Sequence, residues 1–221
     1  MDKLPKKHSV VIIDDHPVMR ESLAAHFAAA GIWEVPKTAA TLEEARAIFV
    51  EEIPELVILD IQLEETWGLD LIPWLRSNAE LRPNAELHPN AELRQNAAVF
   101  PAIVIYSNFN DYAHVSAALG MGVRSYVLKT RNKAELEAVC LAALRGETHI
   151  DRAAEMIMKN IADAKSLLTK REGEILTLVK QGLSNKQISA RLGISRRTVE
   201  NILSCVYDKT GIPSRLELQK L

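Results

Sequence analysis

Five polar side chains, three of them carboxylates, follow short apolar runs in the first part of the chain. Asp14 and Asp15 follow residues 8–13, Asp60 follows 55–59, Ser107 follows 102–106 and Lys129 follows 125–128. Carboxylates gathered at one point repel each other unless a cation joins them, and a hard divalent ion such as Mg²⁺ binds carboxylate oxygens. An aspartate beside such a cation can attack a phosphoryl group whose oxygens a lysine and a hydroxyl bind. If the five positions converge, the pattern predicts phosphoryl chemistry.

The apolar runs predict the elements that bring these side chains together. They are short and contain β-branched residues, which is typical of buried parallel strands, and a weaker strand is expected at 33–37. Between the runs the apolar residues have helical spacing, as in Met19, Leu23, Phe27 and Ala30. This alternation predicts a doubly wound α/β sheet of five parallel strands, in which the carboxyl ends of the strands share one edge. Each polar residue alone could be an ordinary strand terminus, but five at strand ends favour a site.

Composition narrows the class of protein. The 221 residues are 48% hydrophobic and 25% charged, as in globular proteins. We find neither an apolar run long enough to span a membrane nor a signal peptide, so we expect a cytoplasmic protein that does not bind membranes. Cys140 and Cys205 lie in apolar helical patterns without a metal-binding motif, and we expect both to be core thiols rather than a disulfide or a zinc site.

Charge is distributed unevenly along the chain. Residues 166–221 contain ten Lys or Arg and five Asp or Glu, whereas residues 1–165 contain 17 basic and 24 acidic residues. An acidic first part followed by a basic last part indicates two domains, the second of which is a candidate for binding nucleic acid.

The basic last part has the pattern of a series of capped helices. Thr169 with Glu172 and Ser184 with Gln187 have the spacing of capping boxes, and Ser195 is a third candidate N-cap. Helices at 185–192 and 196–209 are joined by a tight turn that contains glycine, which is typical of a helix-turn-helix. The alternative is an ordinary helical bundle with a solvated basic face.

The first part resembles the receiver domain of bacterial two-component response regulators, a flavodoxin-like fold. The segments VVIIDDHPVMRESL, LVILDIQLEETWGLDLI, IVIYS and SYVLKT carry this resemblance, which covers residues 8–145. It implies that Asp60 accepts the phosphoryl group. It further implies roles for six other residues: Asp14, Asp15 and the backbone carbonyl of Gln62 bind Mg²⁺ with Asp60, Ser107 and Lys129 bind the phosphoryl group, and Tyr126 changes rotamer on activation.

The last part resembles the DNA-binding domain of LuxR/NarL/FixJ-type regulators through LTKREGEIL, GLSNKQISARLGIS and TVEN. The resemblance implies that the helix beginning at Arg196 enters the major groove of DNA. It assigns base reading to Glu200, Asn201 and Ser204. It assigns contacts with the DNA backbone to Lys186, Arg196, Arg197, Thr198 and Lys209.

A hexapeptide repeat, NAELRP, NAELHP and NAELRQ, occupies residues 78–95. Ser107 follows Asp60 by 47 residues, and removing the 18 residues of the repeat leaves the spacing that is usual in receivers. Two prolines and leucines spaced six apart argue against one amphipathic helix. We interpret the repeat as a passive surface insert after the third helix. The alternative is a binding site for a partner.

The domains are predicted as a receiver at 1–146, a linker with a helix at 147–165 and a helix-turn-helix domain at 166–221. The function that the resemblances imply is that of a transcriptional regulator, not an enzyme, which a sensor histidine kinase phosphorylates on Asp60. Double-stranded DNA, a second copy when active, and RNA polymerase are the further expected partners. One alternative is a phosphate-independent transcription factor whose receiver serves for dimerisation. The other, a hydrolase of the aspartyl-phosphate type, typically needs a second aspartate where this chain has Gln62.

Overall fold

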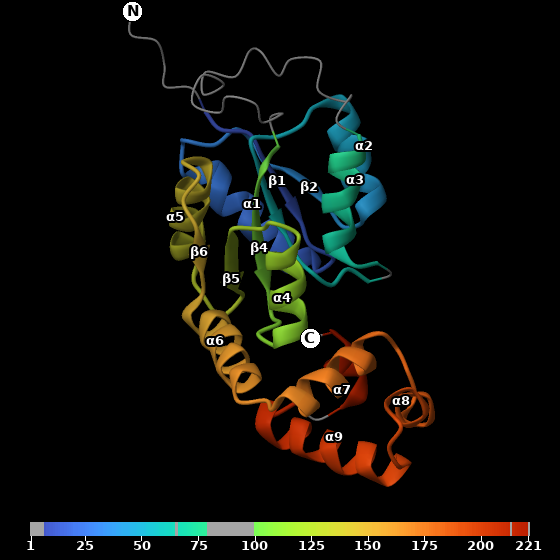
Figure 1. Ribbon diagram of the computed structural model, residues 1–221. Helices are drawn as coiled ribbons and strands as arrows, with labels where there is room; N and C mark the ends of the chain where they lie inside the picture. Colours follow the sequence, from blue (N-terminus) through green and yellow to red (C-terminus); the bar gives the residue numbers. More distant parts are fainter. Residues whose placement is uncertain (1–6, 65, 79–99, 213, 221) are drawn as a thin grey trace, which may run out of the picture. The chain divides into compact units, whose positions relative to one another are not determined.

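The computed structural model describes residues 7–64, 66–78, 100–212 and 214–220. The chain divides into two compact units. One comprises Met1–Phe109 and Ala118–Asp151, and the other comprises Asn110–Ala117 and Arg152–Leu221. Figure 1 shows a sheet with helices in the first unit, whereas the second unit contains helices alone in its described part.

The first unit is built on a parallel sheet in which six strands have the order β2-β1-β3-β4-β5-β6. The strands are β1 (Val10–Ile13), β2 (Lys37–Ala39), β3 (Leu56–Leu59), β4 (Ala102–Ser107), β5 (Ser125–Leu128) and β6 (His149–Ile150). Every residue of β1, β3 and β5 is buried, as expected for central strands covered on both faces. The doubly wound α/β fold predicted from the sequence is therefore confirmed.

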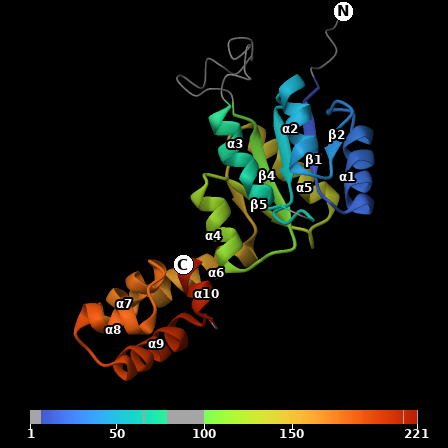
Figure 2. The ribbon, with the colours of Figure 1, turned by 90° about the vertical axis from the view of Figure 1, so that its right-hand side faces the viewer.

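Helices cover both faces of the sheet (Figure 2). One face carries α1 (Pro17–Ala29) and α5 (Lys133–Leu144), and the other carries α2 (Leu42–Glu51) and α3 (Leu71–Ser77). The helix α4 (Tyr112–Gly120) is divided between the two units at Ala117. Between α1, α5 and the strands lies a core that contains Leu23, Phe27, Trp33 and Cys140. The apolar spacing of α1 is thus largely confirmed, although Ala30 lies at the C-cap and is exposed. Trp33 is buried, and its indole N–H donates to Glu137 Oε1 on α5 at 2.9 Å.

Two features of the sheet differ from the sequence prediction. The second strand begins at Lys37 rather than occupying 33–37, because Trp33 is drawn into the core and makes only an isolated bridge with His8. A sixth strand, His149–Ile150, pairs with β5 in the segment predicted to be linker. The sheet therefore has one short strand more than the five predicted. Asp151, at the end of β6, is buried, and Arg131 Nε donates to its Oδ2 at 2.7 Å.

Within the second unit, the helices after residue 151 pack around α9 (Arg196–Thr210). The helices α6 (Arg152–Ser166), α7 (Lys170–Lys180) and α8 (Asn185–Leu192) contact it, and α10 (Arg215–Lys220) contacts α7. Its core includes Ile175, Val179, Ile188, Val199 and Leu203. The small all-α domain predicted from the sequence is therefore present.

The helix ends in this unit follow the signals in the sequence. Thr169 and Ser184 form complete capping boxes with Glu172 and Gln187, and the Ser195 side chain accepts from the Thr198 N–H. Gly193 ends α8 in the left-handed conformation (φ 63°), which a residue with a Cβ rarely adopts. The turn between α8 and α9 is therefore short and defined, as a helix-turn-helix requires.

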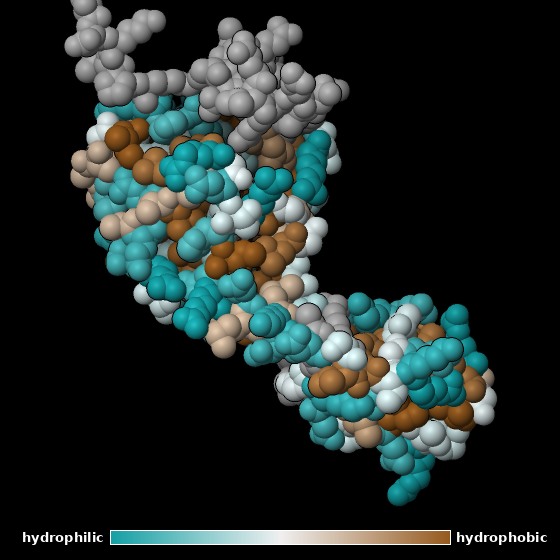
Figure 3. Space-filling model, turned by 60° about the vertical axis from the view of Figure 1, so that its left-hand side comes forward, coloured by the Kyte–Doolittle hydropathy of each residue, from teal (hydrophilic) through white to brown (hydrophobic). Residues whose placement is uncertain are grey.

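Hydrophilic side chains cover much of the face shown in Figure 3, with apolar patches between them. Among the described helices, none is long and apolar enough to cross a membrane. Both cysteines are free, but the prediction that both are core thiols is wrong for Cys205, which is exposed on α9. Cys140 is fully buried, and burial raises the pKa of its thiol.

Candidate functional site: an acidic cluster and an exposed helix face

Three of the predicted site residues meet beyond the carboxyl ends of β1, β3 and β5. Asp14 and Asp60 are almost fully buried, at 2% and 5% exposed. The Lys129 Nζ lies 2.8 Å from Asp14 Oδ2 and 2.6 Å from Asp60 Oδ2. Burial lowers the pKa of Lys129, but hydrogen bonds and charge interactions with Asp14 and Asp60 together outweigh burial and leave the pKa raised. Lys129 is therefore a cation that holds two buried carboxylates together.

The second aspartate of the pair, Asp15, lies on the solvent side of this cluster. Its Oδ1 is buried and lies 2.6 Å from His16 Nδ1, but in a geometry that makes no hydrogen bond. His16 Nδ1 is also 3.3 Å from Asp14 Oδ1. One ligand atom from each of Asp14, Asp15, His16 and Asp60 can be chosen so that all lie within 4.8 Å of one another. His16 was missed from the sequence, although it directly follows the acidic pair.

The backbone fixes the orientation of the Asp60 side chain. Its Oδ1 accepts the N–H of Ile61 at 2.7 Å, so Oδ2 is the oxygen directed at Lys129. The segment that follows β3 then folds back toward the end of this strand, and the Gly68 N–H donates to Ile61 O at 2.7 Å. A Cβ on Gly68 would lie 2.0 Å from the carbonyl oxygen of Asp60. Glycine is therefore required at this position by close approach of two backbone segments.

Ser107 and Tyr126 are connected through one backbone residue. The Phe109 N–H donates to Ser107 Oγ at 3.4 Å, and the Tyr126 hydroxyl donates to Phe109 O at 2.6 Å. Both side chains are fully buried. The Lys129 N–H donates to Ser107 O at 2.9 Å, which links this pair to the acidic cluster. A change in the position of Ser107 can therefore reach Tyr126 through Phe109.

Gln62, the predicted backbone ligand, lies two residues after Asp60 at an isolated antiparallel bridge with Trp67. The donor set of the cluster fits a hard divalent cation, because three carboxylates converge and a buried oxygen of Asp15 lacks a hydrogen bond. Arg20, which the sequence analysis did not select, donates to the backbone oxygen of Asp14 at 2.6 Å. Arg20 thus holds the end of β1 and leaves the Asp14 carboxylate for the site.

The residues predicted to contact DNA lie on α8 and α9. All eight are exposed: Lys186, Arg196, Arg197, Thr198, Glu200, Asn201, Ser204 and Lys209. Arg196 Nε is 3.1 Å from Glu200 Oε1, an exposed pair one turn apart on the helix. Thr198 Oγ1 lies 2.8 Å from Ser195 Oγ, so this side chain takes part in the N-cap of α9.

Lys209, the eighth predicted DNA contact, is held within its own unit. Its Nζ lies 2.7 Å from Glu172 Oε2 and donates to Leu167 O at 3.3 Å. The hydrogen bond from Lys209 is the largest of the effects that lower the pKa of Glu172. Lys209 therefore links α9 to α7 through Glu172, and its contact with DNA stays a prediction.

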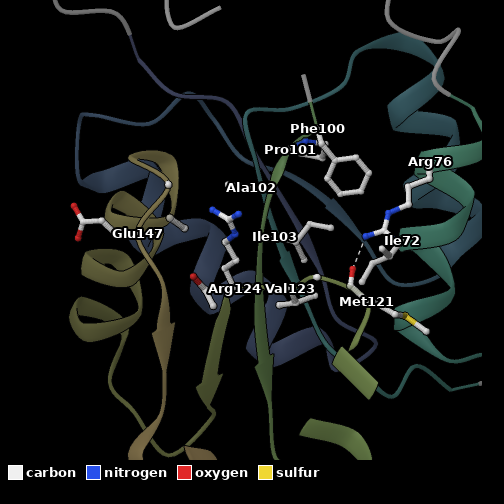
Figure 4. Close-up of a pocket in the computed structure, with 14 residues that line it drawn as sticks. Ile72, Arg76, Phe100, Pro101, Ala102, Ile103, Met121, Val123, Arg124 and Glu147 are labelled. Carbon is white, nitrogen blue, oxygen red and sulfur yellow. Dashed lines mark hydrogen bonds between the residues drawn. The ribbon is translucent and has the colours of Figure 1, made fainter. Parts of the chain in front are cut away.

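A cavity of about 450 Å³ lies at the opposite end of β4 and β5 (Figure 4). Its lining includes Phe100, Arg76, Met121 and Arg124, and Arg76 Nη2 donates to Met121 O at 2.5 Å. Ala102 and Ser125, which begin the two strands, also line it, whereas the acidic cluster lies where the strands end. The cavity is therefore separate from the acidic site.

The two parts of the chain match two family models. Residues 10–84 match the response regulator receiver domain, and residues 166–221 match the bacterial regulatory proteins of the luxR family. The uncharacterized transcriptional regulatory protein YhcZ of Bacillus subtilis is 30% identical over 217 residues, which cover 94% of this chain and 92% of that protein. The chain therefore belongs to the response regulators that carry a LuxR-type DNA-binding domain.

Other relatives agree with this family. The transcriptional regulatory protein LiaR of Bacillus subtilis is 28% identical over 94% of this chain and 93% of its own. A solved structure described as two RcsB dimers bound to two parallel DNAs is 18% identical, with a TM-score of 0.64 and coverage of 97% of both chains. At this identity the structural likeness supports the fold alone.

Proposed function

We propose that this chain is a transcriptional regulator whose binding to DNA depends on phosphorylation of Asp60 by a sensor histidine kinase. The observation that carries the proposal is the convergence of Asp14, Asp15, Asp60 and Lys129 at one edge of the sheet. We assign the receiver to residues 1–146, with the repeat at 78–95, the linker helix to 147–165 and the DNA-binding domain to 166–221. The repeat lies largely outside the described residues.

In this proposal the Asp60 carboxylate attacks the phosphorus of a phosphohistidine, and the bond from phosphorus to the kinase nitrogen breaks. Mg²⁺, when held by Asp14, Asp15, Asp60 and the Gln62 carbonyl, neutralises charge on the phosphoryl oxygens. Lys129 Nζ lies 2.6 Å from Asp60 Oδ2. It must leave this carboxylate oxygen in order to bind a phosphoryl oxygen. Ser107 supplies a hydroxyl to another phosphoryl oxygen.

The response to phosphorylation passes through Phe109. When Ser107 moves toward the phosphoryl group, its hydrogen bond with the Phe109 N–H is lost, and Tyr126 loses a fixed acceptor. Tyr126 then changes rotamer, and the altered surface favours a homodimer. Phosphorylation acts here by biasing an equilibrium between two conformations.

DNA is contacted by α9 and the start of α8. Glu200, Asn201 and Ser204 read base edges in the major groove, and Lys186, Arg196, Arg197 and Thr198 contact phosphates. Two observations support this assignment, namely the exposure of these side chains and the match of residues 166–221 to the luxR family. The solved RcsB structure described as bound to DNA shows that a protein of this fold binds DNA as a dimer. RNA polymerase is a further partner in the proposal.

The proposal is tested by incubating the protein with acetyl phosphate and Mg²⁺ and measuring the intact mass. The wild type should gain one phosphoryl group, and Asp60→Asn should gain none. Asp70→Asn is a matched control, because Asp70 is exposed and its side chain makes no helix-capping hydrogen bond. Equal uptake by Asp60→Asn would exclude Asp60 as the acceptor. DNA affinity unaffected by phosphorylation would favour the phosphate-independent alternative.

A further inference from the structure

His16 lies close to more than one carboxylate. Among the other histidines, His8 pairs with Glu55, His26 with Glu137 and His114 with Asp111. His16 Nδ1 lies close to two carboxylates, Asp15 and Asp14, and within the set that also contains Asp60. Its imidazole therefore points at the acidic cluster.

The backbone holds His16 in this position. The His16 N–H donates to Asp14 Oδ1 at 2.9 Å, and Pro17 begins α1 directly after it. His16 is the N-cap residue of α1, yet its side chain makes no capping hydrogen bond. The side chain is 66% exposed, so it stands on the solvent side of the cluster. The imidazole is thus free of a capping role and lies on the solvent side of the acidic cluster.

The ligand type decides which cation such a site prefers. Carboxylate oxygens suit Mg²⁺, whereas an added imidazole nitrogen raises affinity for first-row transition metals, Mn²⁺ the least among them, and little for Mg²⁺. Three carboxylates and one imidazole within 4.8 Å form a mixed donor set. Binding of both kinds of cation at one place is then expected, with selectivity set by the nitrogen.

We propose that His16 is a ligand in the metal site of Asp14, Asp15 and Asp60 and makes it selective for transition-metal dications over Mg²⁺. This inference rests on the proposed function only in placing the phosphorylation metal at the same carboxylates. Asp15 and His16 supply the outer side of the site, and the buried Asp14 and Asp60 supply the inner side. The resident cation of the site is accordingly set by His16 as well as by the acids.

Mn²⁺ is the probe for the test, because its electron paramagnetic resonance gives both affinity and ligand type. The full-length protein is titrated with Mn²⁺, Mg²⁺ affinity is measured by competition, and electron spin echo modulation reports a bound nitrogen. His16→Asn should lose the nitrogen signal and bind Mn²⁺ at least about tenfold more weakly, a loss at the low end of those seen when metal-site residues are removed. Its Mg²⁺ affinity should stay unchanged.

His114→Asn is the matched control, because His114 Nδ1 lies 2.6 Å from Asp111 Oδ2, the same distance that separates His16 from Asp15. This variant should keep the nitrogen signal and both affinities. Absence of a nitrogen signal from Mn²⁺ bound to the wild type, or equal Mn²⁺ affinity in His16→Asn, would overturn the inference. If Mn²⁺ binds with the nitrogen signal but acetyl phosphate transfers nothing to Asp60, the proposed function fails and the His16 assignment stands.

Discussion

The acidic cluster and the exposed face of α9 differ in how firmly their side chains are held. One carboxylate oxygen of Asp60 accepts a backbone N–H, and the other is paired with Lys129, whose side chain is only 4% exposed. On α9, Arg196 and Glu200 form an ion pair between two predicted DNA contacts. Their side chains are 70% and 48% exposed. The cluster is fixed before a ligand arrives, whereas the helix face is fixed only in its backbone.

This difference follows from what each region does in the proposed function. Phosphoryl transfer requires charges at fixed positions, and burial makes their interactions strong. A helix that reads base edges must exchange water for DNA, so its side chains have to stay accessible. Substitutions in the acidic cluster should therefore lower the stability of the fold, whereas substitutions on α9 should mainly weaken DNA binding.

The largest expected effect is that of Lys129→Met. Loss of the cation between Asp14 and Asp60 leaves two buried carboxylates uncompensated, and breaking such a pair lowers the free energy of unfolding by about 3 kcal/mol. Urea unfolding without divalent ions measures this change, and added Mg²⁺ should recover part of it. Lys37→Met, which removes an exposed pair with Glu52 at 3.6 Å, should change stability by at most about 1 kcal/mol. Equal effects of the two variants would contradict the comparison.

On α9 the expected effects are on DNA binding. Arg196→Ala should weaken binding to all sequences and reduce its salt dependence, whereas Glu200→Ala should change base preference at one position by about 1–3 kcal/mol. Selection from random DNA measures the second effect, and titration at several salt concentrations measures the first. Because Arg196 and Glu200 form an ion pair, the double variant should deviate from additivity. An unchanged selected motif for Glu200→Ala would show that Glu200 reads no base.

Lys209 and Glu172 provide a case between the two regions. Because Lys209 lowers the pKa of Glu172, the folded state gains stability above the ordinary pKa of glutamate and loses it as pH falls through the lowered value. The melting temperature of the wild type should exceed that of Glu172→Gln at pH 7, and the gap should close in acid. Lys209→Ala should lower stability more than DNA affinity. A loss of DNA affinity without a change in melting temperature would show that Lys209 acts mainly as a DNA contact.

The smallest expected effect is that of deleting residues 78–95. The helix α3 ends at Ser77, and the deletion joins this residue to Asn96 without removing a predicted metal or phosphoryl contact. Loop length changes stability by only about 0.6 kcal/mol per doubling, so melting temperature, phosphorylation and DNA binding should stay nearly the same. Loss of phosphotransfer from the kinase with acetyl phosphate uptake intact would instead identify the repeat as a docking site.

The sequence was informative where local chemistry decides the structure. The predicted bounds of α8 agree with the structure because a capping box begins the helix and a left-handed glycine ends it. Because Asp14, Asp60 and Lys129 directly follow buried strands, the sequence also predicted that they lie at one edge of the sheet. The strand β6 escaped prediction because two residues carry no periodic pattern, and its pairing depends on β5, which is distant in the sequence.

Side-chain partners were harder to predict than positions. The sequence placed Lys209 among the DNA contacts, but only the packing of α7 against α9 brings it to Glu172. The role of His16 depends on the direction of one imidazole, which spacing alone does not specify. Cys205 has apolar neighbours in sequence but lies on the outer side of α9, where helix rotation decides exposure.

The close approach of Gly68 to Asp60 has a consequence for genetics. Any single-base missense change in a glycine codon introduces a residue with a Cβ, and here that atom would meet the Asp60 carbonyl at 2.0 Å. Such alleles would displace Asp60, the proposed phosphoacceptor, while leaving every acidic residue and Lys129 in the sequence. In a screen for loss of signalling, this codon should therefore behave like that of Asp60, although its residue contributes no side chain to the chemistry.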